Sequence, residues 1–264
     1  MSYPSQANCD VSTGPPSTSL EHSTPEPFAM FGCWQQNRPR SLSNATGQSL
    51  ARCQRLTSVG LPADGRNAPG ISIVEGFNGR AAFDRSLEHA LGRSYLRAAL
   101  QRLGVAGSVT SSRSDGSPSV PSGYVGSLSH RMGYIVAGAA RVETCIGIGI
   151  DIELERRVLL EPELFLEPRE LAWLDCLQRN QDVDWITLYF SAKESLFKLS
   201  SSLPTSWPSL EGSPLMVSPE GSIDILLSPS GDRTLRDVDL SGCWSRSQRG
   251  GDSVVQTRFT AAFR

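Results

Sequence analysis

Residues 146–153 alternate strictly between isoleucine and, in turn, Gly, Gly, Asp and Glu. Successive side chains of a β-strand point to opposite faces, so this pattern predicts a strand whose isoleucines pack on a core. The other face is bare backbone at Gly147 and Gly149 and then carries the carboxylates of Asp151 and Glu153. We interpret this face as open to a bulky ligand beside a hard cation such as Mg²⁺, which prefers carboxylate and phosphate oxygens. The alternative is an edge strand with a solvated acidic face.

Lysine is rare in this chain, because only Lys193 and Lys198 among the 25 Lys and Arg residues are lysines. Both lie in residues 183–200, where apolar side chains recur at helical spacing and predict a largely buried helix. A lysine supplies a compact ammonium that arginine does not, and buried charges need partners. The alternatives are two unrelated lysines in an arginine-biased chain, an exposed Glu194–Lys198 pair one turn apart, or a capping box between Ser191 and Glu194.

The rest of the chain alternates between helical and strand patterns, which predicts an α+β protein. We expect the first 20 residues to be disordered and the remainder up to residue 70 to be loop-rich, because Ser, Pro and Gly dominate there. The predicted elements are a helix over 82–104, strands over 124–130, 133–142 and 146–153, helices over 162–178 and 183–200, and short antiparallel strands after residue 209.

Composition excludes several classes of protein. A net charge of −2 and a pI near 6.0 exclude a strongly basic nucleic-acid binder. No apolar run approaches the roughly 20 residues of a membrane helix, and no Lys or Arg precedes Arg38, so we expect a cytoplasmic protein without a secretory signal. The six scattered cysteines and three histidines argue against a zinc site or a disulfide framework.

Two further polar groups are candidates for ligand contacts. Ser129 and His130 end a predicted strand beside small residues, where a hydroxyl and an imidazole can bind phosphate. A Ser–His nucleophile pair and an ordinary surface histidine are the alternatives. Arg85 and Arg93 lie near one face of the predicted helix at 82–104, which is also the pattern of a solvated helix face.

Together these segments resemble the 4′-phosphopantetheinyl transferases of the enterobactin-synthase or surfactin (Sfp-like) type. The matching motifs, in the family's order, are Arg85-x-x-Glu88-x-x-x-x-Arg93, Asp115-Gly116-Ser117-Pro118, Gly126-Ser127-Leu128-Ser129-His130, Gly149-Ile150-Asp151-Ile152-Glu153, Phe190-Ser191-Ala192-Lys193-Glu194-Ser195-Leu196-Phe197-Lys198 and a downstream Trp207. The resemblance covers about residues 80–210 and places both lysines on motif positions.

The resemblance implies a pseudo-dimeric α+β fold of two similar lobes, each a small, mostly antiparallel sheet on a long helix, with the active site between them. We expect an N-terminal lobe over residues 21–148, a C-terminal lobe over 149–264, and a monomer. The implied reaction transfers the phosphopantetheine arm of coenzyme A, the co-substrate, to a serine of an acyl or peptidyl carrier protein. It would need Mg²⁺ and release adenosine 3′,5′-bisphosphate. Fatty acid, polyketide, nonribosomal peptide, siderophore and other secondary-metabolite pathways stay open.

The resemblance also implies roles for individual residues. The metal ligands would be Asp151, Glu153 and Glu194. Contacts to coenzyme A would come from Arg85, Arg93, Ser129, His130, Asp151, Lys193 and Lys198. The catalytic residues would be Lys193, Lys198 and Glu194, with Glu194 favoured as the general base and Glu170 as a second candidate, unless Glu170 is an ordinary surface acid. Some relatives carry a basic residue where this chain has Asp115, and Arg113 is a candidate substitute.

Two rival functions use the same residues. A Mg²⁺-dependent phosphohydrolase would activate water in place of a serine hydroxyl. A non-catalytic coenzyme A-binding homologue would bind the ligand without needing Glu194. Membrane and nucleic-acid partners are not expected.

Overall fold

The computed structural model describes residues 70–79, 81–105, 116–155, 161–178, 182–204, 206–207, 209–227 and 235–264. All of them fall within one compact unit. The expectations of disorder in residues 1–20 and of a loop-rich stretch from there to residue 69, and those for Asp115 and Arg113, lie outside the described residues.

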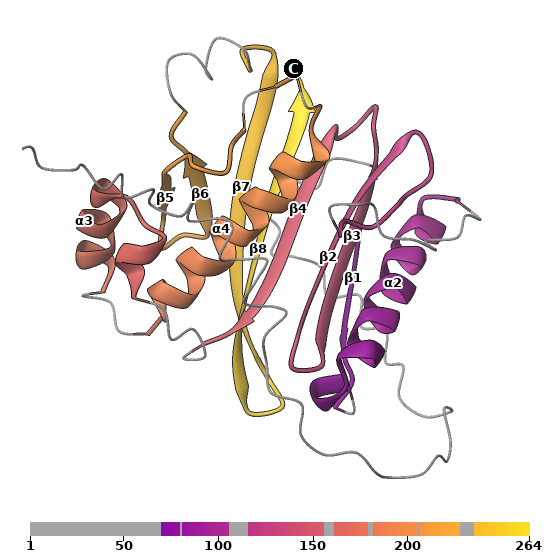
Figure 1. Cartoon of the computed structure of the whole chain (residues 1–264), viewed down its shortest axis with the longest axis horizontal. Coiled ribbons are helices and arrows are strands. Elements are labelled where there is room, and N and C mark those ends of the chain that lie inside the picture. Colours follow the sequence, from indigo (N-terminus) through magenta and orange to yellow (C-terminus); the bar gives the residue numbers. More distant parts are fainter. Residues whose placement is uncertain are drawn as a thin grey trace, which may run out of the picture. The chain divides into compact units, whose positions relative to one another are not determined.

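The first sheet has three antiparallel strands in the order β1-β3-β2 (Figure 1). Its strands are β1 (Ile71–Phe77), β2 (Tyr124–Arg131) and β3 (Tyr134–Arg141). Helix α2 (Arg85–Arg102) follows a short 3-10 helix (Ala81–Phe83) and packs on this sheet. Its buried face, which includes Leu96 and Leu100, meets Ile135 and Ala137 of β3. The sequence predicted this helix and the strands β2 and β3, but not β1.

The second sheet has five antiparallel strands in the order β4-β8-β7-β6-β5 (Figure 1). Its strands are β4 (Gly147–Leu154), β5 (Leu215–Val217), β6 (Ser222–Ile225), β7 (Val238–Arg249) and β8 (Asp252–Phe263). Helix α4 (Trp185–Ser202) packs across β4 and β8, and α3 (Pro168–Leu177) lies beside α4 and β5. The tail strands therefore do not form a small sheet of their own but complete the sheet that begins at β4.

Strand β4 is buried on both of its faces. Its isoleucines pack against β2 and β3 of the first sheet, in a core that includes Val125 and Val136. A Cβ added at Gly149 would overlap the carbonyl oxygen of Ser195, and one at Gly147 would lie 2.7 Å from the Leu203 side chain. The glycines therefore admit helix α4. The alternating pattern is confirmed, whereas the ligand-admitting role of the glycines and the solvated-edge alternative are both wrong.

The helix expected over 162–178 is two helices, a 3-10 turn at Pro162–Leu164 and α3 from Pro168. A proline favours the first turn of a helix because its missing N–H is not needed there, and its ring blocks continuation from the preceding residues. Glu167 and Glu170 close a capping box at this start. The α+β class is confirmed, with antiparallel sheets and helices packed on them. In the described part of the chain, no helix has the length and apolarity needed to cross a membrane.

Candidate active site

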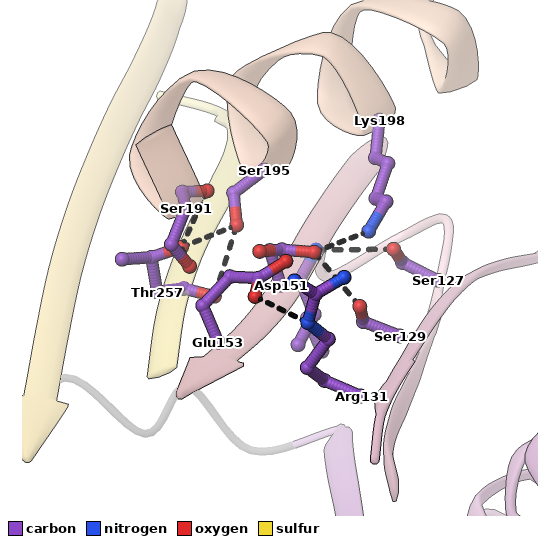
Figure 2. A network of polar contacts seen from close by, with 10 residues as sticks. Ser127, Ser129, Arg131, Asp151, Glu153, Ser191, Ser195, Lys198 and Thr257 are labelled. Atoms are coloured by element: carbon purple, nitrogen blue, oxygen red, sulfur yellow. Dashed lines mark hydrogen bonds and ion pairs between the residues drawn. The ribbon is translucent and has the colours of Figure 1, made fainter. Parts of the chain in front are cut away.

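Charged side chains from both sheets and from α4 meet around Asp151 and Glu153 (Figure 2). The Lys198 ammonium lies 2.7 Å from Asp151 Oδ1, and the Ser129 hydroxyl donates to the same oxygen at 2.8 Å. Arg131 Nε lies 3.0 Å from Glu153 Oε2. Strand β2 thus supplies two of the partners, β4 the carboxylates and α4 the lysine. The prediction that a charge on the buried helix must have a partner is confirmed.

The pKa values of two carboxyl groups of the site are raised, because the groups are buried close to other carboxylates. Burial, together with the charge of Asp151, raises the pKa of Glu153 to about 8. Burial raises the pKa of Glu194 to about 7, with Lys198 opposing the shift and Asp151 adding to it. Burial disfavours the Lys198 ammonium, but Asp151 and Glu194 outweigh it and raise the pKa of this lysine. Buried like charges with shifted pKa values are typical of functional sites.

The donor set fits a hard divalent cation. Asp151 Oδ2 is buried and has no hydrogen-bond partner, although buried carboxylate oxygens are almost always satisfied. Oxygen-only ligands, two of them carboxylates on one strand, suit Mg²⁺. Within the described residues no three His, Cys, Asp or Glu side chains already stand together at metal-binding geometry. The described residues therefore supply oxygen donors of the kind that Mg²⁺ prefers, but not a set of three ligands already arranged around one point.

Hydroxyl groups hold α4 against the sheet beneath the charged cluster (Figure 2). The Thr257 hydroxyl lies 2.7 Å from that of Ser195 and 2.9 Å from that of Ser191, and Thr257 pairs with Asp151 across β4 and β8. Ser127 Oγ accepts the Ile150 N–H at 3.0 Å and ties β2 to the backbone of β4. The Thr257 contacts join α4 to β8, and the Ser127 contact joins β2 to β4.

The two local alternatives for α4 are wrong. The helix begins at Trp185, where the Asp184 side chain caps the Thr187 N–H at 3.1 Å, so Ser191 lies in mid-helix and forms no capping box. The ion pair of Lys198 is made to Asp151, forty-seven positions away in sequence, and not to Glu194 one turn earlier.

The α2 side of the site carries positive charge. His130 Nδ1 lies 3.4 Å from Glu88, and its ring meets His89 edge-to-face with centroids 4.8 Å apart. Burial lowers the pKa of His89, and the charges of His130, Arg85 and Arg93 lower it further. Ser129 is bonded to Asp151 and His130 to Glu88, so the Ser–His nucleophile pair is wrong.

Lys193 and Glu170 form a separate buried pair. Lys193 Nζ lies 2.7 Å from Glu170 Oε1 and donates to the Ser213 carbonyl at 3.1 Å. The Glu170 carboxylate also accepts the N–H groups of Leu215, at 2.7 Å, and Glu167, at 2.8 Å. Glu170 is 1% exposed, so its interpretation as a surface acid is wrong. The pair joins α3, α4 and the segment before β5.

Sequence reasoning missed Arg131 and Thr257. Arg131 follows His130 directly at the end of a predicted strand, and this position was its one signal. Thr257 lies in a strand that the pattern did predict, but its contacts to α4 depend on how distant segments pack.

Two family models match most of the described chain. A 4′-phosphopantetheinyl transferase N-terminal domain matches residues 76–140, and the 4′-phosphopantetheinyl transferase superfamily matches residues 147–257. The first match covers α2, β2 and nearly all of β3 but only the end of β1, and the second covers β4 with Asp151 and Glu153, α3 and α4. The chain belongs to the 4′-phosphopantetheinyl transferase superfamily.

Individual relatives match smaller parts. The chain is 42% identical over 124 residues to the 4′-phosphopantetheinyl transferase Svp of Streptomyces mobaraensis, which covers 45% of this chain and 49% of that protein. The match therefore spans about half the length of this curated relative. Among solved structures, a holo-ACP synthase from Plasmodium yoelii is 18% identical, with 46% of this chain and 97% of that chain covered and a TM-score of 0.30. A holo-[acyl-carrier-protein] synthase from Neisseria meningitidis is 19% identical, with 46% and 99% covered and a TM-score of 0.31.

Proposed function

We propose that this chain transfers the 4′-phosphopantetheine arm of coenzyme A to a serine hydroxyl of an acyl or peptidyl carrier protein. The reaction is Mg²⁺-dependent and releases adenosine 3′,5′-bisphosphate. The observation that carries this proposal is the buried cluster of Asp151, Glu153 and Lys198, whose Asp151 Oδ2 has no hydrogen-bond partner. Family membership supports the same reaction class.

Asp151, Glu153 and Glu194 would hold the Mg²⁺. When bound, the cation neutralises charge on the pyrophosphate and improves the leaving group. Lys198 is held at the cluster by Asp151, and its raised pKa keeps it cationic at neutral pH. An ammonium at this place stabilises the charge that develops on phosphate oxygens during transfer.

Arg85, Arg93, Ser129 and His130 would contact the nucleotide and its phosphates. The lowered pKa of His89 supports this assignment, because it reflects burial among positive neighbours on the same side of the site. Because Nδ1 of His130 faces Glu88, Nε2 is the ring nitrogen that would contact a ligand. Ser129 lies between these groups and the carboxylates through its bond to Asp151.

Glu194 is the better candidate for the general base. Without the cation, burial raises the pKa of Glu194 to about 7, and with the cation bound one Glu194 oxygen would hold the metal while the other would accept the serine proton. The Glu170 carboxylate, in contrast, is occupied by Lys193 and two backbone N–H groups. The carrier serine oxygen forms a bond to the phosphorus that bears the pantetheine arm, and the bond from that phosphorus to the bisphosphate breaks. The serine proton passes to Glu194. We propose that Lys193 and Glu170 join α3 to α4. Direct contact of these two residues with phosphate or substrate is the weaker proposal.

In this proposal the two sheets with their helices are the two lobes of the implied pseudo-dimer, and the boundary between the lobes lies just before β4, because residue 149 falls inside that strand. Coenzyme A would lie between them, against Asp151 on one side and the face of α2 on the other. We further propose that the protein acts as a monomer in the cytoplasm. Its carrier would belong to fatty acid synthesis or to a secondary-metabolite pathway such as siderophore assembly.

The test is intact-mass spectrometry of apo carrier proteins incubated with this protein, coenzyme A and Mg²⁺. We expect the carrier to gain one phosphopantetheine arm, and the gain to be lost with EDTA and with Glu194→Gln. The matched control is Glu143→Gln, the same change at an exposed position outside the cluster, which should transfer at the wild-type rate.

Each rival leaves its own signature in this assay. Free phosphopantetheine without a heavier carrier would mean hydrolysis. Unmodified fatty-acid, polyketide and peptidyl carriers, together with normal coenzyme A binding by Glu194→Gln, would mean a binding homologue. Either result would overturn the proposed transfer.

A further inference from the structure

Arg131 is a cationic partner of Glu153 that lies outside every motif of the family resemblance. It ends β2 in the first sheet, and its side chain crosses to Glu153 on β4 in the second sheet (Figure 2). The pair is therefore a contact between the two sheets as well as a charge contact within the site.

The ion pair is close but poorly directed. Arg131 Nε and Glu153 Oε2 lie 3.0 Å apart, yet neither atom completes a hydrogen bond of normal geometry. Lys198 and Asp151, in contrast, lie 2.7 Å apart and form a hydrogen bond. The exposed fractions of the two pairs are similar, 22% for Arg131 and 9% for Glu153 against 24% for Lys198 and 4% for Asp151, so hydrogen-bond geometry and not exposure separates the two ion pairs. Of the two cations, Arg131 is the one more easily displaced.

The backbone that carries Arg131 is fixed. Met132 and Gly133 turn the chain with φ of 50° and 84°, and the Gly133 N–H donates to Glu88 Oε1 at 2.8 Å. Glu88 belongs to α2, so the turn is attached to the helix of the first sheet. Because the turn is held, any departure of the guanidinium from Glu153 is a movement of the side chain alone.

We propose that Arg131 is an internal counter-cation of Glu153 that a divalent cation displaces when it binds. The inference rests on the proposed function, because Glu153 is one of the carboxylates assigned to the metal. Arg131 stabilises the metal-free protein, since a buried carboxylate without a partner is costly. It also weakens metal binding, since the contact between Arg131 and Glu153 must be broken before the carboxylate can turn to the metal. The residue thus sets the Mg²⁺ concentration at which the site fills.

Calorimetric titration with Mg²⁺ alone, without coenzyme A or carrier, tests the inference. Arg131→Gln removes the charge, and Arg131→Lys keeps it as the matched control. We expect Arg131→Gln to bind Mg²⁺ about three- to tenfold more tightly than wild type, and Arg131→Lys to stay near wild type. In EDTA, Arg131→Gln should unfold at a lower temperature than both. Unchanged or weaker Mg²⁺ binding by Arg131→Gln overturns the proposal, as does the absence of Mg²⁺ binding in all three proteins.

A measurement on wild-type protein avoids dependence on a folded Arg131→Gln variant. The Nε–H resonance of Arg131 is assigned in a ¹⁵N spectrum by its loss in Arg131→Lys. We expect it to shift as Mg²⁺ saturates the protein, because the guanidinium leaves Glu153. A resonance that saturating Mg²⁺ does not move contradicts displacement. If wild type fails to modify any carrier while these metal effects appear, the proposed transfer fails and the role of Arg131 stands.

Discussion

Helices α2 and α4 are built alike but carry their charges differently. Each has 18 residues, each begins after an aspartate cap, and each packs on an antiparallel sheet. The buried residues of α2 are Gly92, Tyr95, Leu96, Ala99 and Leu100, all without charge. Those of α4 include four side chains with a hydroxyl group, Thr187, Tyr189, Ser191 and Ser195, and the ammonium of Lys193.

The difference follows from the strand beneath each helix. Gly147 and Gly149 let α4 approach β4 so closely that its polar side chains are enclosed with those of the sheet. An unpaired charge costs more free energy when it is enclosed, so the charged side chains there pair with one another. The pKa values of Glu153 and Glu194 are raised for the same reason. The arginines of α2 lie nearer to water, since Arg85 and Arg97 are exposed and Arg93 is half-buried. The comparison teaches that close helix packing, more than the number of charges, converts polar residues into a candidate site.

The largest effect should come from removing the charge of Lys198. We expect Lys198→Met to lower the rate of transfer to a carrier about 100-fold or more, because a group that stabilises charge in the transition state is lost. The same change at Arg97, an exposed cation of α2, should leave the rate within about twofold. Steady-state kinetics of both variants check this. If both variants lost the same amount of transfer rate, a cation on α4 would matter no more than an exposed cation on α2.

The next effect concerns the glycine that admits α4. Gly149→Ala drives a methyl group into the Ser195 carbonyl, which cannot move without shifting the helix. We expect the free energy of unfolding to fall by about 3 kcal/mol or more. Gly212→Ala is the matched control, since a Cβ there meets nothing within 4 Å, and it should change stability little. Urea denaturation measures both, and an unaffected Gly149→Ala would show that α4 is not closely seated.

A smaller effect is expected from the hydroxyl contacts beneath α4. Thr257→Val keeps the shape of the side chain but leaves the hydroxyls of Ser191 and Ser195 without this partner. We expect a loss of about 1–3 kcal/mol in stability, with Thr257→Ser close to wild type because it restores the hydroxyl. Thermal and urea unfolding test the pair. If serine were as destabilising as valine, packing of the methyl group would account for the loss.

A further prediction is a pH dependence of stability without metal. The pKa of Glu153 rises from its ordinary 4.5 to about 8 in the fold, so the folded protein holds a proton that the unfolded chain releases. This contribution is complete below pH 4.5 and is lost as the pH rises through about 8. We expect the unfolding free energy of wild type minus that of Glu153→Gln to decrease over this range in EDTA. Denaturation at several pH values measures it, with Glu143→Gln as control, and a difference that rises with pH would contradict the assignment.

Much of the local structure could be predicted from particular residues. The Ile/Gly/acid alternation predicted β4, and the helical spacing of apolar residues predicted α2 and α4 nearly to their ends. Strand β1 was not predicted, because residues 71–77 directly follow a stretch rich in Ser, Pro and Gly. The break before α3 coincides with Pro168, a residue that favours the first turn of a helix. Of the motif residues, Asp151, Glu153 and Lys198 do meet, whereas Lys193 is engaged by Glu170.

The sequence by itself determined the strand and helix periodicities, the α+β class and the motifs that identify the superfamily, because these depend on neighbouring residues and their spacing. Only the tertiary structure decided that Gly147 and Gly149 make room for a helix, that the two lysines take different partners, and that Arg131 reaches Glu153. The partner of a buried charge depends on which distant segments pack around it. Asp151 and Lys198 are forty-seven positions apart, and no local pattern encodes their 2.7 Å contact.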